Sequence, residues 1–207
     1  MDSVAEARVL AALEAVDAAY EELCSTSTDA VGPEFRMEMA VRLEASGRRH
    51  LGLSYRLVGE ICAPPDGVAK RGVKARLARE LRVNRGEVDR RAKLAARVRE
   101  RRVGLGPETM APELPLLAKA MHDGLVGEDH IREVCKAVDA LPKWVSPVEK
   151  RWAERKLVFH ARRQDPGFVA AVGRAVQDRI NPDGVFDERD RAARRGFSLG
   201  PQGPDGM

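Results

Sequence analysis

The sequence predicts an all-α protein built from several helices, and three observations carry this prediction. Aromatic residues make up only 4% of the 207 residues, whereas sheet proteins rely on aromatic and β-branched faces. Alanine, leucine, arginine and glutamate, which favour helices, recur throughout. Hydrophobic residues make up 43% and charged residues 33%, so the chain can bury a core and still keep much solvated surface.

The first part of the chain, residues 1–62, is predicted to be a helical hairpin. Apolar residues recur at spacings of four and three in a helix over residues 3–23, which is typical of one helical face. This stripe consists of Val9, Leu13, Val16, Tyr20 and Leu23. The pattern leaves two arrangements open: antiparallel pairing with the next helix of the same chain, or a coiled-coil homodimer through the N-terminal helices.

A second amphipathic helix follows and is expected to stop near Gly47, because glycine is unfavourable inside helices. Its apolar residues are Phe35, Met39 and Leu43. Residues 51–61 are apolar without a clear period, and the Pro- and Gly-containing residues 63–67 predict a turn or short linker.

Positive charge is concentrated in one segment. Residues 70–102 hold 14 Lys or Arg against 4 acidic residues, while residues 1–69 hold 6 Arg against 12 acidic residues. Residues 103–207 hold 16 of each. Such a basic cluster attracts polyanions, although a solvated helix surface would also account for it.

The second predicted domain, residues 70–180, begins with a helix–turn–helix at residues 73–102. A helix over residues 71–81 is followed by a short turn and by a second helix that starts after Asn84. Asn84 and Glu87 have the spacing of a capping box. The residues expected to face inward are Val73, Leu77, Ala78, Leu81, Val83, Val88, Ala92, Ala95 and Val98.

An outward basic ridge is predicted along the second helix, at spacings of three and four. It consists of Arg90, Lys93, Arg97 and Arg101. Near the start of a recognition helix, Arg85 and Arg90 are placed to read guanine, and the other cations to contact phosphates. The predicted DNA-binding residues are Lys70, Lys74, Arg76, Asn84, Arg85, Arg90, Lys93, Arg97 and Arg101. Replacing Lys93 and Arg97 by Glu is expected to abolish duplex binding without unfolding the chain.

The apolar and polar pattern of residues 77–94 resembles the helix–turn–helix of ParB-type proteins. Its matching positions are Leu77, Ala78, Leu81, Asn84, Val88 and Leu94. One position departs from the pattern, since Arg82 stands where a glycine usually makes the turn. Glu87 and Asp89 either restrain non-specific binding or, in the case of Glu87, accept a hydrogen bond from cytosine.

Four further helices are expected over residues 113–122, 128–141, 147–163 and 166–180. Ser146, Pro147 and Glu149 form a helix start with a capping box, and Asp165 is the expected N-cap of the last helix. Residues 181–207 are predicted to be a turn and a tail that contains the only expected strand, FSLG at 197–200. This strand lacks a partner, which is expected of a fragment of a longer protein or of a disordered tail.

Several of these segments resemble the actinobacterial 13E12-repeat family. The most specific is NPDGVFDERDRAARRGFSLGPQGPDGM, supported by ARELRVNRGEVDRRAKLAARV, PELPLLAKAMHDGLVGEDHIREV and ALPKWVSP. The resemblance covers about residues 73–207. It implies a domain of unknown function that usually precedes an HNH endonuclease module, or a protein associated with mobile elements.

Within the chain the sequence predicts no catalytic site, no metal site and no cofactor. An HNH site needs closely grouped histidine, asparagine and acidic residues. The four histidines are instead widely separated: His50, His122, His130 and His160. The acidic residues 187–190 alternate with arginines and are expected to form helical ion pairs. A longer parent protein could still carry the nuclease.

The sequence therefore predicts a DNA-binding module that recognises duplex DNA and targets or regulates an HNH-type or mobile-element-associated protein. The alternative is a helical dimerisation or protein-interaction domain that binds no nucleic acid. Six neutralised phosphates would give a slope of about −5 for log affinity against log salt. No apolar run is long enough to cross a membrane, and the three cysteines form no disulfide pattern. A cytoplasmic protein is expected, located at the nucleoid if it binds DNA.

Overall fold

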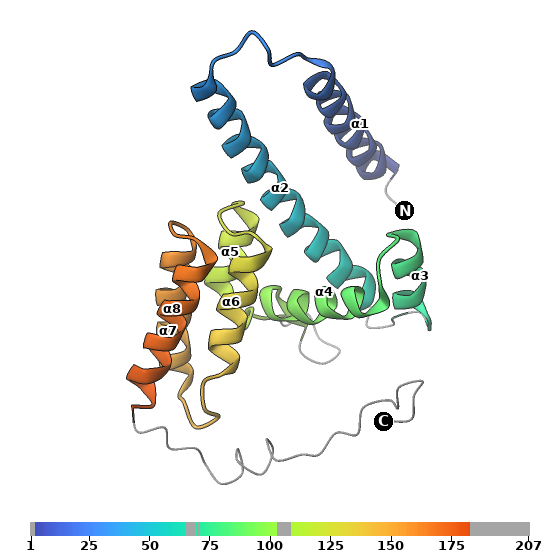
Figure 1. The fold of residues 1–207 in the computed structure, drawn as a ribbon. Coiled ribbons are helices and arrows are strands. Elements are labelled where there is room, and N and C mark those ends of the chain that lie inside the picture. The colour runs from blue at the N-terminus through green and yellow to red at the C-terminus, as the bar shows by residue number, and fades with distance from the viewer. Residues whose placement is uncertain (1–2, 65–68, 70, 103–108, 183–207) are drawn as a thin grey trace, which may run out of the picture. The chain divides into compact units, whose positions relative to one another are not determined.

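The computed structural model describes residues 3–64, 69, 71–102 and 109–182, and this part of the chain is mostly helical (Figure 1). Its helices are α1 (Ser3–Ser25), α2 (Pro33–Cys62), α3 (Val73–Glu80), α4 (Arg85–Val98), α5 (Pro115–His122), α6 (Glu128–Asp139), α7 (Pro147–Ala161) and α8 (Pro166–Ile180). No helix in these ranges combines the length and the apolar character needed to cross a bilayer.

A short antiparallel ladder joins β1 (Arg101–Arg102) to β2 (Thr109–Met110). No pattern in the sequence predicts this ladder, because two residues per strand are too few to show alternation. The expected strand at 197–200 lies outside the described residues, as does the acidic and basic segment 187–190.

The chain divides into two compact units, residues 1–44 and 45–207. The division falls inside α2, whereas the sequence placed it after residue 62. The reason is that the second half of α2 buries Tyr55 and Val58 in the cores of the second unit.

In the first unit, no residue of the described range 3–44 is buried. The apolar stripe of α1 is exposed, with 60% exposure at Val9 and 43% at Tyr20. A packed antiparallel hairpin would bury this stripe, so that arrangement is not formed here. The exposed stripe is the feature that a coiled-coil partner would require.

The prediction that the second helix stops near Gly47 is wrong, because α2 continues to Cys62. The later glycines in this helix serve close packing. A Cβ atom at Gly52 would lie 2.7 Å from the Met121 carbonyl oxygen, and one at Gly59 would lie 2.7 Å from the Ala95 Cβ atom. Burial of Tyr55 and Val58 outweighs the cost of about 1 kcal/mol for each helical glycine.

The main core of the second unit lies among α5, α6, α7 and α8 (Figure 1). Its fully enclosed side chains are Leu117, Val126, Val134, Leu157 and Val169. The predicted caps hold these helices in place: Ser146 and Glu149 form the expected capping box, and Asp165 accepts from the amides of Gly167 and Phe168. The four expected helices are confirmed, with ends that differ from the prediction by two residues at most.

Glu154 of α7 is a buried carboxylate that caps a neighbouring helix. Its Oε1 atom accepts hydrogen bonds from the backbone amides of Leu116 and Leu117 at 2.8 and 3.0 Å, at the start of α5. These two donors would otherwise be unpaired in the first turn. The residue is 1% exposed, and burial raises its pKa more strongly than the two amide hydrogen bonds lower it.

Candidate nucleic-acid interface

Helices α3 and α4 are joined by a tight turn at residues 81–84. The Val83 amide donates to the Ala78 carbonyl at 3.0 Å, and the Arg82 amide donates to the Arg79 carbonyl at 3.1 Å. This hydrogen-bond pair is the Schellman motif, which requires a left-handed residue directly after the helix end. Arg82 supplies it, with φ of 54°. The position where the sequence departs from the expected glycine is therefore a left-handed position held by arginine.

The corner between the two helices is sealed by a small apolar cluster. Ala78 of α3 and Val88 of α4 are buried together with Val58 of α2. Leu77 and Val83 pack against them, as predicted. Leu81 does not belong to the seal, because 43% of it is exposed. The small Ala78 side chain lets α4 approach α3 closely.

The predicted capping box at the start of α4 is absent. Asn84 is the N-cap residue, but its side chain accepts no capping hydrogen bond. The Glu87 carboxylate turns instead to Arg90, at 2.8 and 2.9 Å, and to Arg91, at 2.6 Å. Charged partners one turn away compete successfully with a neutral amide donor. The exposed Asn84 side chain is consequently left available at the start of α4.

Carboxylates of the same unit pair with two residues of the predicted outward ridge, and the outward orientation is wrong for Arg97 but not for Arg90, which is exposed. Arg90 donates to Glu87 and also to Glu128 of α6. Arg97 is only 18% exposed and binds Glu113 at 2.9 Å and Asp139 at 2.9 Å. Burial alone would lower the pKa of Arg97, but its carboxylate partners raise it. Sequence spacing did not reveal the pairs with Glu128, Glu113 and Asp139, since these carboxylates come from distant segments.

Lys74 is also neutralised, although it lies close to the surface. Its Nζ atom is 2.7 Å from the Asp89 Oδ1 atom, and this ion pair links α3 to α4. The hydrogen bond to Asp89 raises the pKa of Lys74, and the same bond lowers the pKa of Asp89. The pair positions the helices and adds no net charge to the surface.

Four cations of the α3–turn–α4 surface are exposed and form no ion pair with a described residue. They are Arg76, Arg82, Arg85 and Lys93. Arg85 and Lys93 share one face of α4 with Asp89, since these residues are four positions apart. Arg82 was not among the predicted site residues. The signal that could have found it was its position in a turn, where side chains point into solvent.

Two predicted site residues are not placed. Lys70 lies outside the described residues, and for Arg101 the structure describes only the backbone, in β1.

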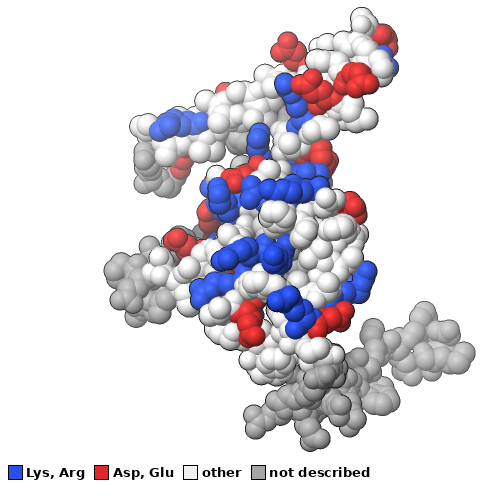
Figure 2. Space-filling view, turned by 90° about the vertical axis from the view of Figure 1, so that its left-hand side faces the viewer, with Lys and Arg blue, Asp and Glu red and all other residues white. Residues whose placement is uncertain are grey.

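A second basic surface was missed by the sequence analysis. Lys and Arg gather on the side of the second unit where α7 and α8 lie (Figure 2). The exposed cations of these helices and of the connection between them are Arg151, Arg155, Lys156, Arg162, Arg163, Arg174 and Arg179. The charge count over residues 103–207 did not indicate this surface, because that segment holds equal numbers of basic and acidic residues. A count over residues 147–180 alone, with 8 basic and 4 acidic residues, would have identified it.

No group of three or more potential metal-ligating side chains occurs within the described ranges. His130 has a structural role. Its Nδ1 atom accepts from the Gly127 amide at 3.4 Å, and its Nε2 atom is 2.8 Å from the Gln164 carbonyl oxygen, which fixes the tautomer protonated at Nε2. The three cysteines are free, and Cys24 is exposed.

These features define a helical protein with a short helix pair that presents unpaired cations. Comparison with known proteins places it more narrowly. Residues 37–207 match the family model described as "Domain of unknown function (DUF222)", and the chain belongs to this family. This confirms the resemblance to the 13E12-repeat family.

The relatives of the chain include mycobacterial proteins. It is 33% identical over 192 residues to the uncharacterized protein MT1160 of Mycobacterium tuberculosis (strain CDC 1551 / Oshkosh), covering 91% of this chain and 45% of the relative. It is 28% identical over 211 residues to the uncharacterized protein Mb1179c of Mycobacterium bovis, covering 100% of this chain and 46% of the relative. The chain thus spans less than half the length of these curated relatives. No solved structure matches it.

Proposed function

We propose that the chain binds duplex DNA through α3, the following turn and α4, with α4 in the major groove. The observation that carries this proposal is the set of four exposed, unpaired cations on one helix–turn–helix-like pair. The likeness of residues 77–94 to ParB-type helix–turn–helix proteins supports it, since the left-handed turn expected there is formed by Arg82.

Different residues of this surface are placed to contact the bases and the phosphates of DNA. Arg85 and Asn84 lie at the start of α4, where side chains reach base edges in helix–turn–helix complexes. Lys93 lies two turns further along, and Arg76 and Arg82 flank the helix, where phosphates pass. Arg90 is not assigned to base reading, because Glu87 and Glu128 hold its guanidinium group.

The number of unpaired cations sets the expected salt dependence. Four neutralised phosphates give a slope of about −3.6 for log affinity against log salt. This value is smaller than the slope of about −5 expected from the sequence, because Arg90, Arg97 and Lys74 are already paired.

The test is fluorescence anisotropy with a labelled random-sequence duplex over a series of salt concentrations. The variant Arg85→Gln/Lys93→Gln should weaken binding at least tenfold and reduce the slope by about 1.8. The matched control Arg155→Gln/Arg162→Gln removes two charges from the α7–α8 surface and should leave both values nearly unchanged. If only Arg155→Gln/Arg162→Gln weakened binding, the interface would lie on α7 and α8 instead. An unaltered affinity in both variants would reject both surfaces.

We further propose that this DNA-binding part targets or regulates a longer protein of the HNH-nuclease type and acts at the nucleoid. The shorter length of the chain relative to its mycobacterial relatives supports a larger parent. The chain itself is expected to cleave no DNA, because its histidines are not grouped as an HNH site requires. Cleavage of plasmid DNA by the purified chain with magnesium or manganese would contradict this assignment.

A second candidate function is homodimerisation through the N-terminal helices. It is favoured by the apolar stripe of α1, which has coiled-coil spacing and is exposed along its whole length. The two functions are compatible, since many helix–turn–helix proteins bind two half-sites as dimers.

A further inference from the structure

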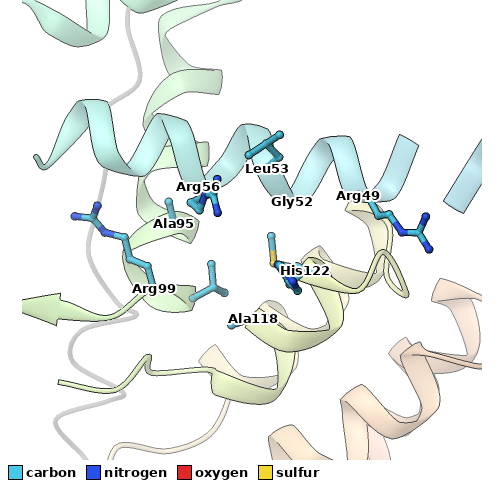
Figure 3. A pocket seen from close by; sticks show the side chains of 10 residues that line it. Arg49, Gly52, Leu53, Arg56, Ala95, Arg99, Ala118 and His122 are labelled. Atoms are coloured by element: carbon cyan, nitrogen blue, oxygen red, sulfur yellow. The ribbon is translucent and has the colours of Figure 1, made fainter. Parts of the chain in front are cut away.

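A cavity of about 450 Å³ opens between α2, α4 and α5 of the second unit. Its volume lies in the range of small-molecule sites. Leu53 of α2, Ala95 and Val98 of α4, and Ala118 and Met121 of α5 supply apolar lining (Figure 3). The site is open enough for ligand entry, because Leu53 is 44% exposed.

The cavity exists because small residues stand where the helices cross. Gly52 brings the α2 backbone against the α5 backbone at Met121, and Gly59 brings it against Ala95. The methyl groups of Ala95 and Ala118 then leave space between these two contacts that larger side chains would fill. This space is unrelated to the exposed cations of the α3–turn–α4 surface.

The polar lining of the cavity is entirely basic. It consists of Arg49, Arg56, Arg99 and His122, and no acidic residue contributes. In Figure 3, Arg49 and Arg99 stand at opposite ends with their guanidinium groups directed outward, and Arg56 and His122 lie between them. Arg56 approaches a carboxylate only loosely, with its Nε atom 3.7 Å from Glu60.

Arg99 has an unsatisfied donor. Its Nη2 atom donates to the Ala63 carbonyl at 2.8 Å, but its buried Nε atom has no hydrogen-bond partner among the described residues. Because this Nε atom is shielded from the cavity as well as from solvent, a ligand there does not reach it, and the exposed Arg49 and Arg56 are the cations that an anionic oxygen can approach.

We propose that this cavity binds a medium-chain aliphatic carboxylate, with the alkyl chain against the apolar lining and the carboxylate at the rim, beside the exposed Arg49 and Arg56. The cationic lining without an acidic residue selects the anion, and the apolar lining selects the alkyl body. This inference does not depend on the proposed DNA-binding function, because it uses none of the four cations assigned to DNA.

Isothermal titration calorimetry with decanoate tests the proposal, below the concentration at which decanoate forms micelles. Decanoate should bind at least tenfold more tightly than decan-1-ol, which has the same chain without the charge. It should also bind at least tenfold more tightly than butyrate, which has the charge without the chain. Equal affinity for decanoate and decan-1-ol would overturn the role of the arginines, and absence of decanoate binding would overturn the site.

Variants locate the binding. Ala118→Leu fills the cavity and should weaken both ten-carbon ligands at least tenfold, and Leu53→Phe provides a second filling variant if the first fails to fold. Arg49→Gln/Arg56→Gln should weaken decanoate at least fivefold and leave decan-1-ol unchanged, whereas Arg155→Gln on α7 should change neither. Decanoate binding that survives both filling variants would show that the ligand occupies another place.

Discussion

At the scale of single residues, Arg82 combines a conformational cost with an exposed positive charge. A left-handed conformation costs a non-glycine residue about 1–2 kcal/mol. Arg82 adopts it with φ of 54° and keeps its side chain exposed. A glycine would form the same turn without this steric cost but would remove a cation from the candidate interface.

We expect Arg82→Gly to raise the free energy of unfolding by about 0.5–1 kcal/mol and to weaken DNA binding. Urea denaturation and anisotropy measure the two effects. Arg82→Ala is the matched control, because it removes the same charge and keeps the steric cost. It should weaken DNA binding similarly without gaining stability. Equal stability of the Gly and Ala variants would contradict the left-handed assignment.

Glu154 gives a pH prediction. Its pKa is raised in the folded protein, mainly by burial, so the folded state binds a proton more tightly than the unfolded state. Stability from this residue is therefore fully present below its ordinary pKa of 4.5 and is lost as the pH rises through the raised value.

The measurement is urea denaturation of the wild type and of Glu154→Gln from pH 4 to pH 7. The difference in unfolding free energy, wild type minus variant, should fall above about pH 4.5 with a slope of at most about 1.4 kcal/mol per pH unit. Taking the difference cancels the carboxylates with lowered pKa, such as Asp89 and Glu149. If this difference in unfolding free energy rose with pH, the pKa of Glu154 would be lowered in the folded protein and not raised.

At the scale of the element, α4 carries cations of two kinds that look alike in the sequence. Lys93 is exposed and unpaired, whereas Arg97 is held by Glu113 and Asp139. Lys93→Gln should change stability by less than about 0.5 kcal/mol and should weaken DNA binding. Arg97→Gln should destabilise the fold by about 1–2 kcal/mol, because two carboxylates lose their partner.

Thermal and urea denaturation, together with anisotropy at fixed salt, separate the two effects. Replacing Arg97 by Glu is therefore expected to destabilise the fold, in contrast to the prediction from the sequence that the chain stays folded when Lys93 and Arg97 are both replaced by Glu. If Arg97→Gln weakened DNA binding without any loss of stability, Arg97 would belong to the interface after all.

At the scale of the whole molecule, the α1 stripe bears on oligomeric state. With five exposed apolar residues at coiled-coil spacing, the chain should form a dimer in light-scattering measurements. Leu13→Glu/Tyr20→Glu should give a monomer, because the charges would face each other across the seam. Ala18→Glu places a charge on the opposite face of α1 and should leave the dimer intact. A monomeric wild type would exclude this function for α1.

Much of the fold could be predicted from local sequence. The helix starts at Ser146 and Asp165 and the buried residues Ala78 and Val88 follow from short-range capping and periodicity, and the structure confirms them. The continuation of α2 past Gly47 could not be predicted, because the buried partners of Tyr55 and Val58 lie far away in the chain. For the candidate site, the sequence identified the basic segment but not which of its cations are free.

The sequence by itself determined the helical class, the family and the place of the basic segment, because composition, capping and periodicity act within a few residues. Only the tertiary structure decided which cations remain without an ion-pair partner among the described residues. Glu113, Glu128 and Asp139 reach Arg90 and Arg97 from other helices and loops, and the helix crossings at Gly52 and Gly59 create a basic cavity. Ion pairing and close packing depend on distance in space, which the order of residues does not reveal.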